Sequence, residues 1–279
     1  MTTPSWILVL ADIGLNLTHD SFDRDRERVM EDAWAAGVRF AVITGSTLAS
    51  SHAAVQLVRA RPRFLRATAG VHPHHARELH EADRPELEAL IALPEIGAVG
   101  ECGLDHYRNF SSHEDQERAF RLQLELAVQS GKPAFLHQRD AHAAFMSILR
   151  EYRARLPGGV AHCFTGDAAQ LQDCLDLDLH IGITGWICDE RRGTHLRELV
   201  RRIPAERLLL ETDAPYLLPR DLDPKPHSRR NEPRYLPHVL AAVATARREP
   251  ASEIALHTTE NALRLFGFPA QKATANAHL

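Results

Sequence analysis

The chain has 279 residues, with 33 lysines and arginines against 37 aspartates and glutamates, a formal net charge of −4 and four cysteines. This charge excludes a protein held to nucleic acid by bulk positive charge, and four cysteines without a CxxC pair exclude a disulfide scaffold. No apolar run approaches the roughly 18 residues of a membrane span, and the early apolar stretch at 6–11 is too short for a signal peptide. We therefore expect a globular protein of the reducing cytoplasm with no membrane association.

Short apolar runs alternate with amphipathic stretches along most of the chain. The runs predict eight β-strands, at residues 7–13, 40–44, 65–71, 96–101, 134–137, 159–162, 180–183 and 208–212. Between the fourth and fifth strands, a capping box formed by Ser111 and Glu114 predicts the start of a helix. After the fifth strand, Asp140 is expected to cap the next helix.

This alternation of strands and helices indicates a parallel sheet. Eight strand–helix units in about 210 residues favour a closed (β/α)8 TIM barrel, an α/β fold in a single domain at residues 1–268. A doubly wound open sheet is the alternative arrangement of the same elements. The proline-rich stretch 214–237 predicts a long loop after the eighth strand, and residues 269–279 form a polar C-terminal tail.

Four of the predicted strands lead into side chains that bind metals. Glu101 closes the fourth strand, His137 the fifth and His162 the sixth, and Asp213 follows the eighth. The C-terminal ends of barrel strands converge on one face, so these residues are expected to meet there. Two carboxylates and two imidazoles suit Mg²⁺, Mn²⁺ or Zn²⁺. Taken singly, each histidine is more often a surface residue and each carboxylate could cap a helix, so the prediction rests on the set.

The third predicted strand leads into a histidine-rich turn that contains His72 and His74. Imidazoles on the C-terminal face of a barrel could protonate a leaving group or bind phosphate. The alternative is a polar turn shaped by Pro73. His72 and His74 are therefore candidates for catalysis.

The loop predicted after the eighth strand is basic. Between Lys225 and Arg234, four basic residues minus one acidic residue leave a local charge of +3 in an acidic chain. On a barrel this loop would overhang the metal face, where Arg229 and Arg230 could hold an anionic backbone. A solvated charged loop is the alternative.

Several longer motifs contain these residues. They are Asp12-Ile13-Gly14-Leu15-Asn16-Leu17, Gly70-Val71-His72-Pro73-His74, Gly100-Glu101-Cys102-Gly103-Leu104-Asp105, His137-Gln138-Arg139-Asp140-Ala141-His142, His162-Cys163-Phe164-Thr165-Gly166 and Glu211-Thr212-Asp213-Ala214-Pro215-Tyr216. Together they closely resemble the TatD family of metal-dependent deoxyribonucleases, and the resemblance runs from about residue 12 to residue 266. Segments 182–186 and 228–233 resemble the protein that gave the family its name more than its paralogues.

The resemblance implies a TIM barrel of the amidohydrolase superfamily and Mg²⁺-dependent hydrolysis of DNA. The implied activity is that of a 3'-5' exonuclease that favours single strands, with RNA as a further candidate substrate. By motif position, the resemblance implies the ligand set already reached from the strand ends: Glu101, His137, His162 and Asp213. It also implies that Arg139, close to His137 in the same motif, lies near the substrate.

One pair of positions departs from the wider superfamily. Many superfamily members carry His-x-His after the aspartate of the first strand, where this chain has Gly14 and Asn16. The TatD family is similar to this chain in that respect, so the departure bears on the number of metal ions and not on the family. None of the lysines closes a predicted strand, so Glu101 must supply any carboxylate that bridges two ions. This favours the nucleases among the members of the superfamily.

The resulting hypothesis is hydrolysis of phosphodiester bonds in single-stranded DNA, by a monomer that binds one or two divalent ions. Mg²⁺ is the expected ion, with Mn²⁺ or Zn²⁺ as the alternatives. Asp213 is the candidate general base, and His72 or His74 would protonate the departing oxygen. The candidate substrate-binding residues are Arg139, Arg229 and Arg230. The alternatives are a hydrolase of another bond, such as an aminoacyl-tRNA ester, and a non-enzymatic partner in protein export.

Overall fold

The strands form one parallel sheet in which each strand pairs with the next in sequence. The computed structural model describes residues 8–269. The strands are β1 (Leu10–Leu15), β2 (Val38–Ile43), β3 (Leu65–Ala69), β4 (Ile96–Asp105), β5 (Ala134–Arg139), β6 (Gly159–Ala161), β7 (His180–Ile183) and β8 (Leu208–Leu210). Leu15 and Ala214 bridge the seam between β1 and β8, and the amide of Asp213 donates to the carbonyl oxygen of Gly14 at 2.8 Å. The predicted single-domain (β/α)8 barrel is confirmed.

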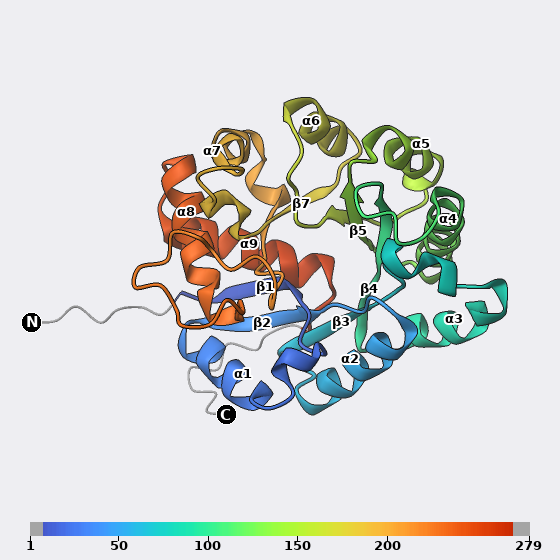
Figure 1. Ribbon diagram of the computed structural model, residues 1–279, viewed down its shortest axis with the longest axis horizontal. Helices are drawn as coiled ribbons and strands as arrows, with labels where there is room; N and C mark the ends of the chain where they lie inside the picture. Colours follow the sequence, from blue (N-terminus) through green and yellow to red (C-terminus); the bar gives the residue numbers. More distant parts are fainter. Residues whose placement is uncertain (1–7, 270–279) are drawn as a thin grey trace, which may run out of the picture.

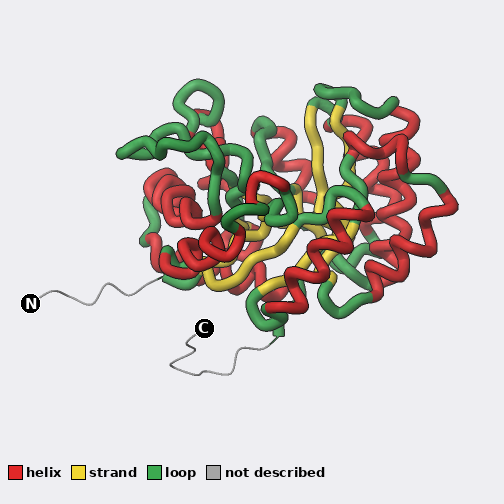
Figure 2. The backbone as a smooth tube through the Cα atoms, turned by 60° about the horizontal axis from the view of Figure 1, so that its bottom comes forward, coloured by secondary structure: helices red, strands yellow, loops and turns green. Residues whose placement is uncertain are grey.

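Helices surround the sheet on its outside (Figures 1 and 2). They are α1 (Arg26–Ala35), α2 (Leu48–Ala60), α3 (Arg84–Ala92), α4 (His113–Ser130), α5 (His142–Arg153), α6 (Ala168–Asp176), α7 (Thr194–Leu199), α8 (Leu236–Arg247) and α9 (Ala251–Leu265). Within residues 8–269, no helix has the length and apolar character that crossing a membrane requires. The predicted polar tail lies outside the described residues, apart from residue 269.

The interior of the barrel is filled by side chains from alternate strand positions. Ala11 and Ile13 of β1, for example, belong to one buried cluster together with Phe135 of β5 and Phe266, which follows α9. The rings of Phe135 and Phe266 have centroids 6.3 Å apart within this cluster. On its other side, the Phe135 ring lies 4.8 Å from the ring of His162, so the packed core directly supports a predicted site residue.

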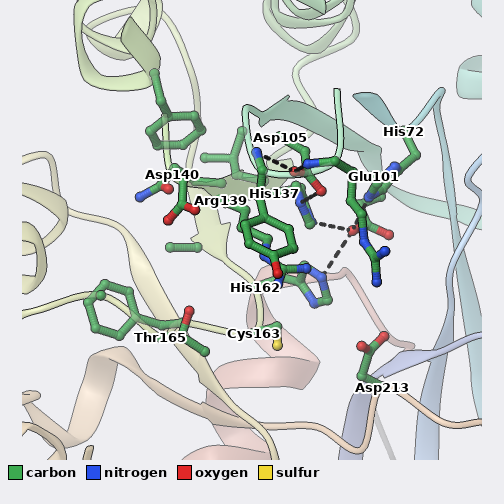
Figure 3. Close-up of a pocket in the computed structure, with 18 of the residues that line it drawn as sticks. His72, Glu101, Asp105, His137, Arg139, Asp140, His162, Cys163, Thr165 and Asp213 are labelled. Carbon is green, nitrogen blue, oxygen red and sulfur yellow. Dashed lines mark hydrogen bonds and ion pairs between the residues drawn. The ribbon is translucent and has the colours of Figure 1, made fainter. Parts of the chain in front are cut away.

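Strands β4 and β5 extend past the residues predicted to end them. β4 continues to Asp105, and β5 runs two residues beyond His137, so Glu101 and His137 lie within their strands. The extension is stabilised by the pairing of Gly103 with His137 and by Gln116, whose Oε1 accepts from the Asp105 amide at 2.8 Å. The side chains of Glu101 and His137 nevertheless face the same space above the barrel (Figure 3).

Two predicted helix caps are wrong. Helix α4 is capped by Ser112, whose Oγ accepts from the amide of Asp115 at 3.1 Å, whereas Ser111 forms hydrogen bonds with the turn after β3. Asp140 has a φ of 53° and does not cap α5, which begins after Ala141 without a side-chain cap. The loop predicted at 214–237 ends earlier than expected, in a 3-10 turn that leads into α8.

Replacing Gly103 with alanine is expected to destabilise the barrel by about 3 kcal/mol. Gly103 has a φ of 146°, and a Cβ there would lie far inside van der Waals contact with the carbonyl oxygen of His137. Gly131→Ala is the matched control, because Gly131 also has a positive φ, of 65°, but open space around its Cβ position. Urea denaturation should show a loss of about 1 kcal/mol in the control. Equal losses in the two variants would contradict the steric explanation.

Candidate active site

A cavity of about 1250 Å³ opens at the C-terminal ends of the strands. Its wall includes most of the predicted site residues, His72, His74, Glu101, His137, Arg139, His162 and Asp213, and it also includes Asn16. Figure 3 shows Glu101, His137 and His162 grouped around one space, with Asp213 below them. Arg229 and Arg230 do not contribute to this wall, so the structure separates these two arginines from the other predicted site residues.

The carboxylate of Glu101 lies among three histidines. Its Oε1 is 3.0 Å from Nδ1 of His137, 3.0 Å from Nε2 of His162 and 3.4 Å from Nε2 of His72. Burial alone would raise the pKa of Glu101. The positive charges of His162 and His72 and the hydrogen bond from His137 outweigh burial and hold that pKa well below its usual range. Glu101 is therefore ionised, and three imidazole nitrogen atoms lie within 3.4 Å of its carboxylate.

This arrangement fits a divalent cation. The ligand atoms of His72, Glu101 and His137 all lie within 4.8 Å of one another. Nε2 of His137 is buried without a hydrogen bond, and a buried polar atom without a partner costs about 1–3 kcal/mol. A cation would supply a partner for such a nitrogen, and mixed oxygen and nitrogen donors suit Mg²⁺, Mn²⁺ or Zn²⁺. His72, predicted to act on the leaving group, is thus also a candidate ligand.

Asp213, the fourth predicted ligand, lies apart from the Glu101 cluster (Figure 3). Within residues 8–269 it has no hydrogen bond or ion pair with Glu101 or its histidines, and its Oδ1 instead accepts from Nδ2 of Asn16 at 3.0 Å. Burial raises the pKa of Asp213 to about 7, with contributions from the negative charges of Glu101 and Glu211. The side chain can therefore hold a proton near neutral pH.

Glu211, which was not among the predicted site residues, fixes the orientation of His162. Its Oε2 is 2.9 Å from Nδ1 of His162, and its Oε1 accepts from the amide of Cys163. Burial would lower the pKa of His162, but the charges of Glu211 and Glu101 hold it well above the usual value. The bond at Nδ1 leaves Nε2 directed at Glu101, which is the usual way in which an outer carboxylate positions a ligating histidine. The signal in the sequence was a glutamate directly after an apolar strand.

The carboxylate of Glu211 also explains the departure at position 14. A Cβ on Gly14 would lie far inside van der Waals contact with Glu211 Oε2, and a Cβ on Gly182 would do the same to Oε1. A histidine at position 14 would therefore require the Glu211 carboxylate to move from its place beside His162. Asn16, at the second position, instead donates to Asp213.

Asp105, also absent from the predicted set, orients two histidines. Its Oδ2 is 2.7 Å from Nε2 of His74 and 3.6 Å from Nε2 of His137. Its Oδ1 accepts from the amides of Tyr107 and Arg108 at 3.0 and 2.8 Å. Burial would raise the pKa of Asp105, but the nearby His137 imidazole and the hydrogen bonds from His74 and the Arg108 amide hold it well below its usual range. Asp105 therefore stays ionised beside His74.

The guanidinium of Arg230 forms ion pairs with carboxylates of the same chain. It is 2.9 and 2.7 Å from the two carboxylate oxygens of Asp25 and 2.7 Å from Oε1 of Glu232. Asp25 directly precedes α1, so these bonds fasten the loop after β8 to the start of that helix. Arg229, on the same loop, is exposed.

Aromatic side chains are exposed at the rim of the cavity. Tyr107, Phe110 and Tyr216 are 57%, 54% and 51% exposed, and all three contribute to the cavity wall. The guanidinium of Arg139 lies over the ring of Tyr107, 3.8 Å from its centroid. Exposed rings of this kind offer stacking surfaces for planar groups.

A family model described as TatD related DNase matches residues 11–267. The chain belongs to the TatD family. Among curated members of this family, the 3'-5' ssDNA/RNA exonuclease TatD of Edwardsiella piscicida is 54% identical over 257 residues, which cover 92% of this chain and 99% of that protein. The protein of the same name from Citrobacter rodentium is 51% identical over 94% of this chain and 99% of its own length.

Solved structures of TatD proteins have the same fold. A TatD homologue from Escherichia coli K12 superposes with a TM-score of 0.85 at 28% identity, over 95% of this chain and 100% of that one. A TatD family hydrolase from Entamoeba histolytica has the same TM-score at 25% identity and the same coverage. The family predicted from the motifs is confirmed.

Proposed function

We propose that this TatD family member is a metal-dependent 3'-5' exonuclease that hydrolyses phosphodiester bonds in single-stranded DNA, with RNA as a second substrate. The observation that carries the proposal is the Glu101 carboxylate among three imidazoles in an open cavity. The names of relatives that are 51% and 54% identical over nearly their whole length support the same activity. An intact set of metal-type ligands argues against a passive role in protein export.

The proposed ligands are Glu101, His137 and His162, joined by His72 or Asp213. A bound divalent ion would polarise the phosphate and lower the pKa of a water molecule, which makes the water a nucleophile at neutral pH. Mg²⁺ is the proposed ion, and Mn²⁺ or Zn²⁺ are the alternatives for a set so rich in imidazole. Titration with each metal distinguishes one bound ion from two.

The remaining residues have proposed roles in proton transfer. Asp213 would accept the proton of the attacking water, because a carboxylate with a pKa of about 7 is an effective base near neutral pH. His74 would donate a proton to the departing sugar oxygen, with Asp105 as the positioning residue that fixes its ring at 2.7 Å. His72 is the alternative donor.

The rim of the cavity supports a preference for single strands. Unpaired bases stack on aromatic side chains at about 1–3 kcal/mol per base, whereas bases inside a duplex are not free to do so. Tyr107, Phe110 and Tyr216 are exposed rings in this position. The positive charge of Arg139 beside Tyr107 suits a neighbouring phosphate.

Replacing Arg139 with alanine is expected to raise KM for single-stranded DNA about tenfold, since a charge-assisted contact is worth about 1.5–3 kcal/mol. The salt dependence of log KM should also fall, by roughly 0.7 in slope, because one phosphate contact is lost. Arg229→Ala is the matched control: Arg229 is exposed outside the cavity wall, and its loss should change KM by less than about twofold. The reverse pattern would move the substrate contact to the loop after β8.

We also propose that the protein is a monomer of the cytoplasm. Cys102, Cys163, Cys174 and Cys188 are all free thiols, which suits a reducing compartment. Size-exclusion chromatography with light scattering tests the oligomeric state, and a dimer mass at working concentration would contradict it.

The deciding experiment is cleavage of 5'-labelled single-stranded DNA and RNA by the purified chain with Mg²⁺, with Mn²⁺ and with EDTA. We expect a ladder of one-nucleotide steps that shortens from the 3' end and disappears with EDTA. Aminoacyl-tRNA is tested in parallel. Hydrolysis of its ester without cleavage of either strand would assign the chain to a different hydrolase reaction.

A further inference from the structure

A second group of metal-type side chains lies outside the cavity. Cys188 ends the 3-10 helix η4 (Gly185–Cys188), Asp221 belongs to the loop between β8 and α8, and His238 is in the first turn of α8. Their sulfur, oxygen and nitrogen ligand atoms all lie within 4.8 Å of one another. None of the three contributes to the cavity wall, so this group is separate from the Glu101 site. Figure 1 shows the orange loop before α8 next to that helix, on the left of the barrel.

The group is closed on one side and open on the other. Nε2 of His238 is 2.7 Å from Oδ1 of Asp221. Cys188 is a free thiol with no exposed surface, whereas the side chains of Asp221 and His238 are 34% and 33% exposed. A hydrated ion could therefore enter from solvent and meet the sulfur at the inner end of the group.

We propose that Cys188, Asp221 and His238 bind a divalent ion of the Zn²⁺ class, independently of the Glu101 site. Thiolate, imidazole and carboxylate are all zinc ligands, and three protein ligands leave a fourth tetrahedral position for water on the open side. A sulfur ligand selects against Mg²⁺, which takes oxygen ligands. The two sites are thus expected to differ in the ion that they prefer.

The ion would fasten the loop after β8 to the barrel. Other contacts already join the same segments: Nε of Arg220 is 3.0 Å from Oδ2 of Asp189, and a Cβ on Gly185 would press on the carbonyl oxygen of Leu217. Helix α8 also packs against η4. This loop begins next to Asp213, and Leu217 contributes to the cavity wall. A zinc-class ion here would therefore hold one wall of the active-site cavity in place.

Titration with Co²⁺ followed by absorption spectroscopy tests the site, because a thiolate ligand adds a sulfur-to-cobalt charge-transfer band that oxygen and nitrogen ligands do not give. We expect the band in the wild-type chain and its loss in Cys188→Ser. Cys163→Ser and Cys174→Ser are the matched controls, since both thiols contribute to the active-site cavity, and both variants should keep the band.

Asp221→Asn and His238→Gln provide a second measurement on side chains that are one-third exposed, should Cys188→Ser fail to fold. After dialysis against Zn²⁺, each variant is expected to retain about one ion per chain fewer than the wild type. The proposal is overturned if the wild-type chain shows no band, or if Cys163→Ser abolishes a band that Cys188→Ser keeps. Equal zinc content in the wild type and both variants would also overturn it, and would leave the three side chains as a hydrogen-bonded contact.

Discussion

Glutamine in place of Glu101 is expected to lower the rate of DNA cleavage roughly a thousandfold, because a metal site stabilises the transition state by several kcal/mol and about 1.4 kcal/mol corresponds to a factor of ten. The amide keeps the shape of the side chain but removes the negative charge that three imidazoles share at 3.0–3.4 Å. The imidazoles would then have no common anion, so the bound ion would be lost or displaced.

The rate is measured from the ladder of 5'-labelled DNA, and bound metal is measured on the same samples. Glu95→Gln is the matched control, because Glu95 directly precedes β4 at the opposite end of the strand and pairs with Arg59 at 2.8 Å. The same chemical change there should alter the rate by less than about twofold. Cleavage by Glu101→Gln at a rate within about tenfold of the wild type would contradict the ligand assignment.

Glutamine in place of Glu211 is expected to weaken metal binding about 10–100-fold, the usual effect of losing an outer carboxylate behind a ligating histidine. Glu211 accepts from two donors, Nδ1 of His162 and the amide of Cys163. A glutamine has one oxygen and an NH₂ group, so it can satisfy only one of them. If its NH₂ faces His162, the imidazole proton moves to Nε2, and that nitrogen can no longer bind a cation.

This variant tests positioning because it separates metal affinity from chemistry. The metal concentration for half-maximal activity should rise 10–100-fold, while kcat at saturating metal should stay within about tenfold of the wild type. Glu206→Gln, in the exposed turn before β8, is the matched control and should leave both quantities unchanged. A fall in kcat of about a thousandfold that excess metal does not restore would instead give Glu211 a direct part in the reaction.

The fold was predictable because each short apolar run in the sequence corresponds to one strand of the sheet. β7 has the predicted bounds, His180–Ile183, and the seven other strands overlap their predicted ranges. The site was predictable for a related reason: side chains near the ends of parallel strands share one face whatever their detailed contacts. Glu101, His137 and His162 therefore meet although their strands are separated by helices.

Residues that act through another side chain could not be found in this way. Glu211 contacts His162, and Asp105 contacts His74. The role of a carboxylate near a strand end cannot be inferred from the sequence until the position of its partner is known. Counting charges also does not separate a free arginine from a paired one. The partner of Arg230 is Asp25, which is far away in sequence, so its ion pair appeared only in the folded chain.

The position of Glu211 between Gly14 and Gly182 has a consequence for how such sites change over time. A histidine at position 14 would collide with Glu211, and removing Glu211 first would leave His162 without its orienting bond. Either order of single substitutions passes through an impaired protein. The space at position 14 and the orientation of His162 are therefore coupled: a histidine at position 14 requires the Glu211 carboxylate to shift, and with it the bond that orients His162.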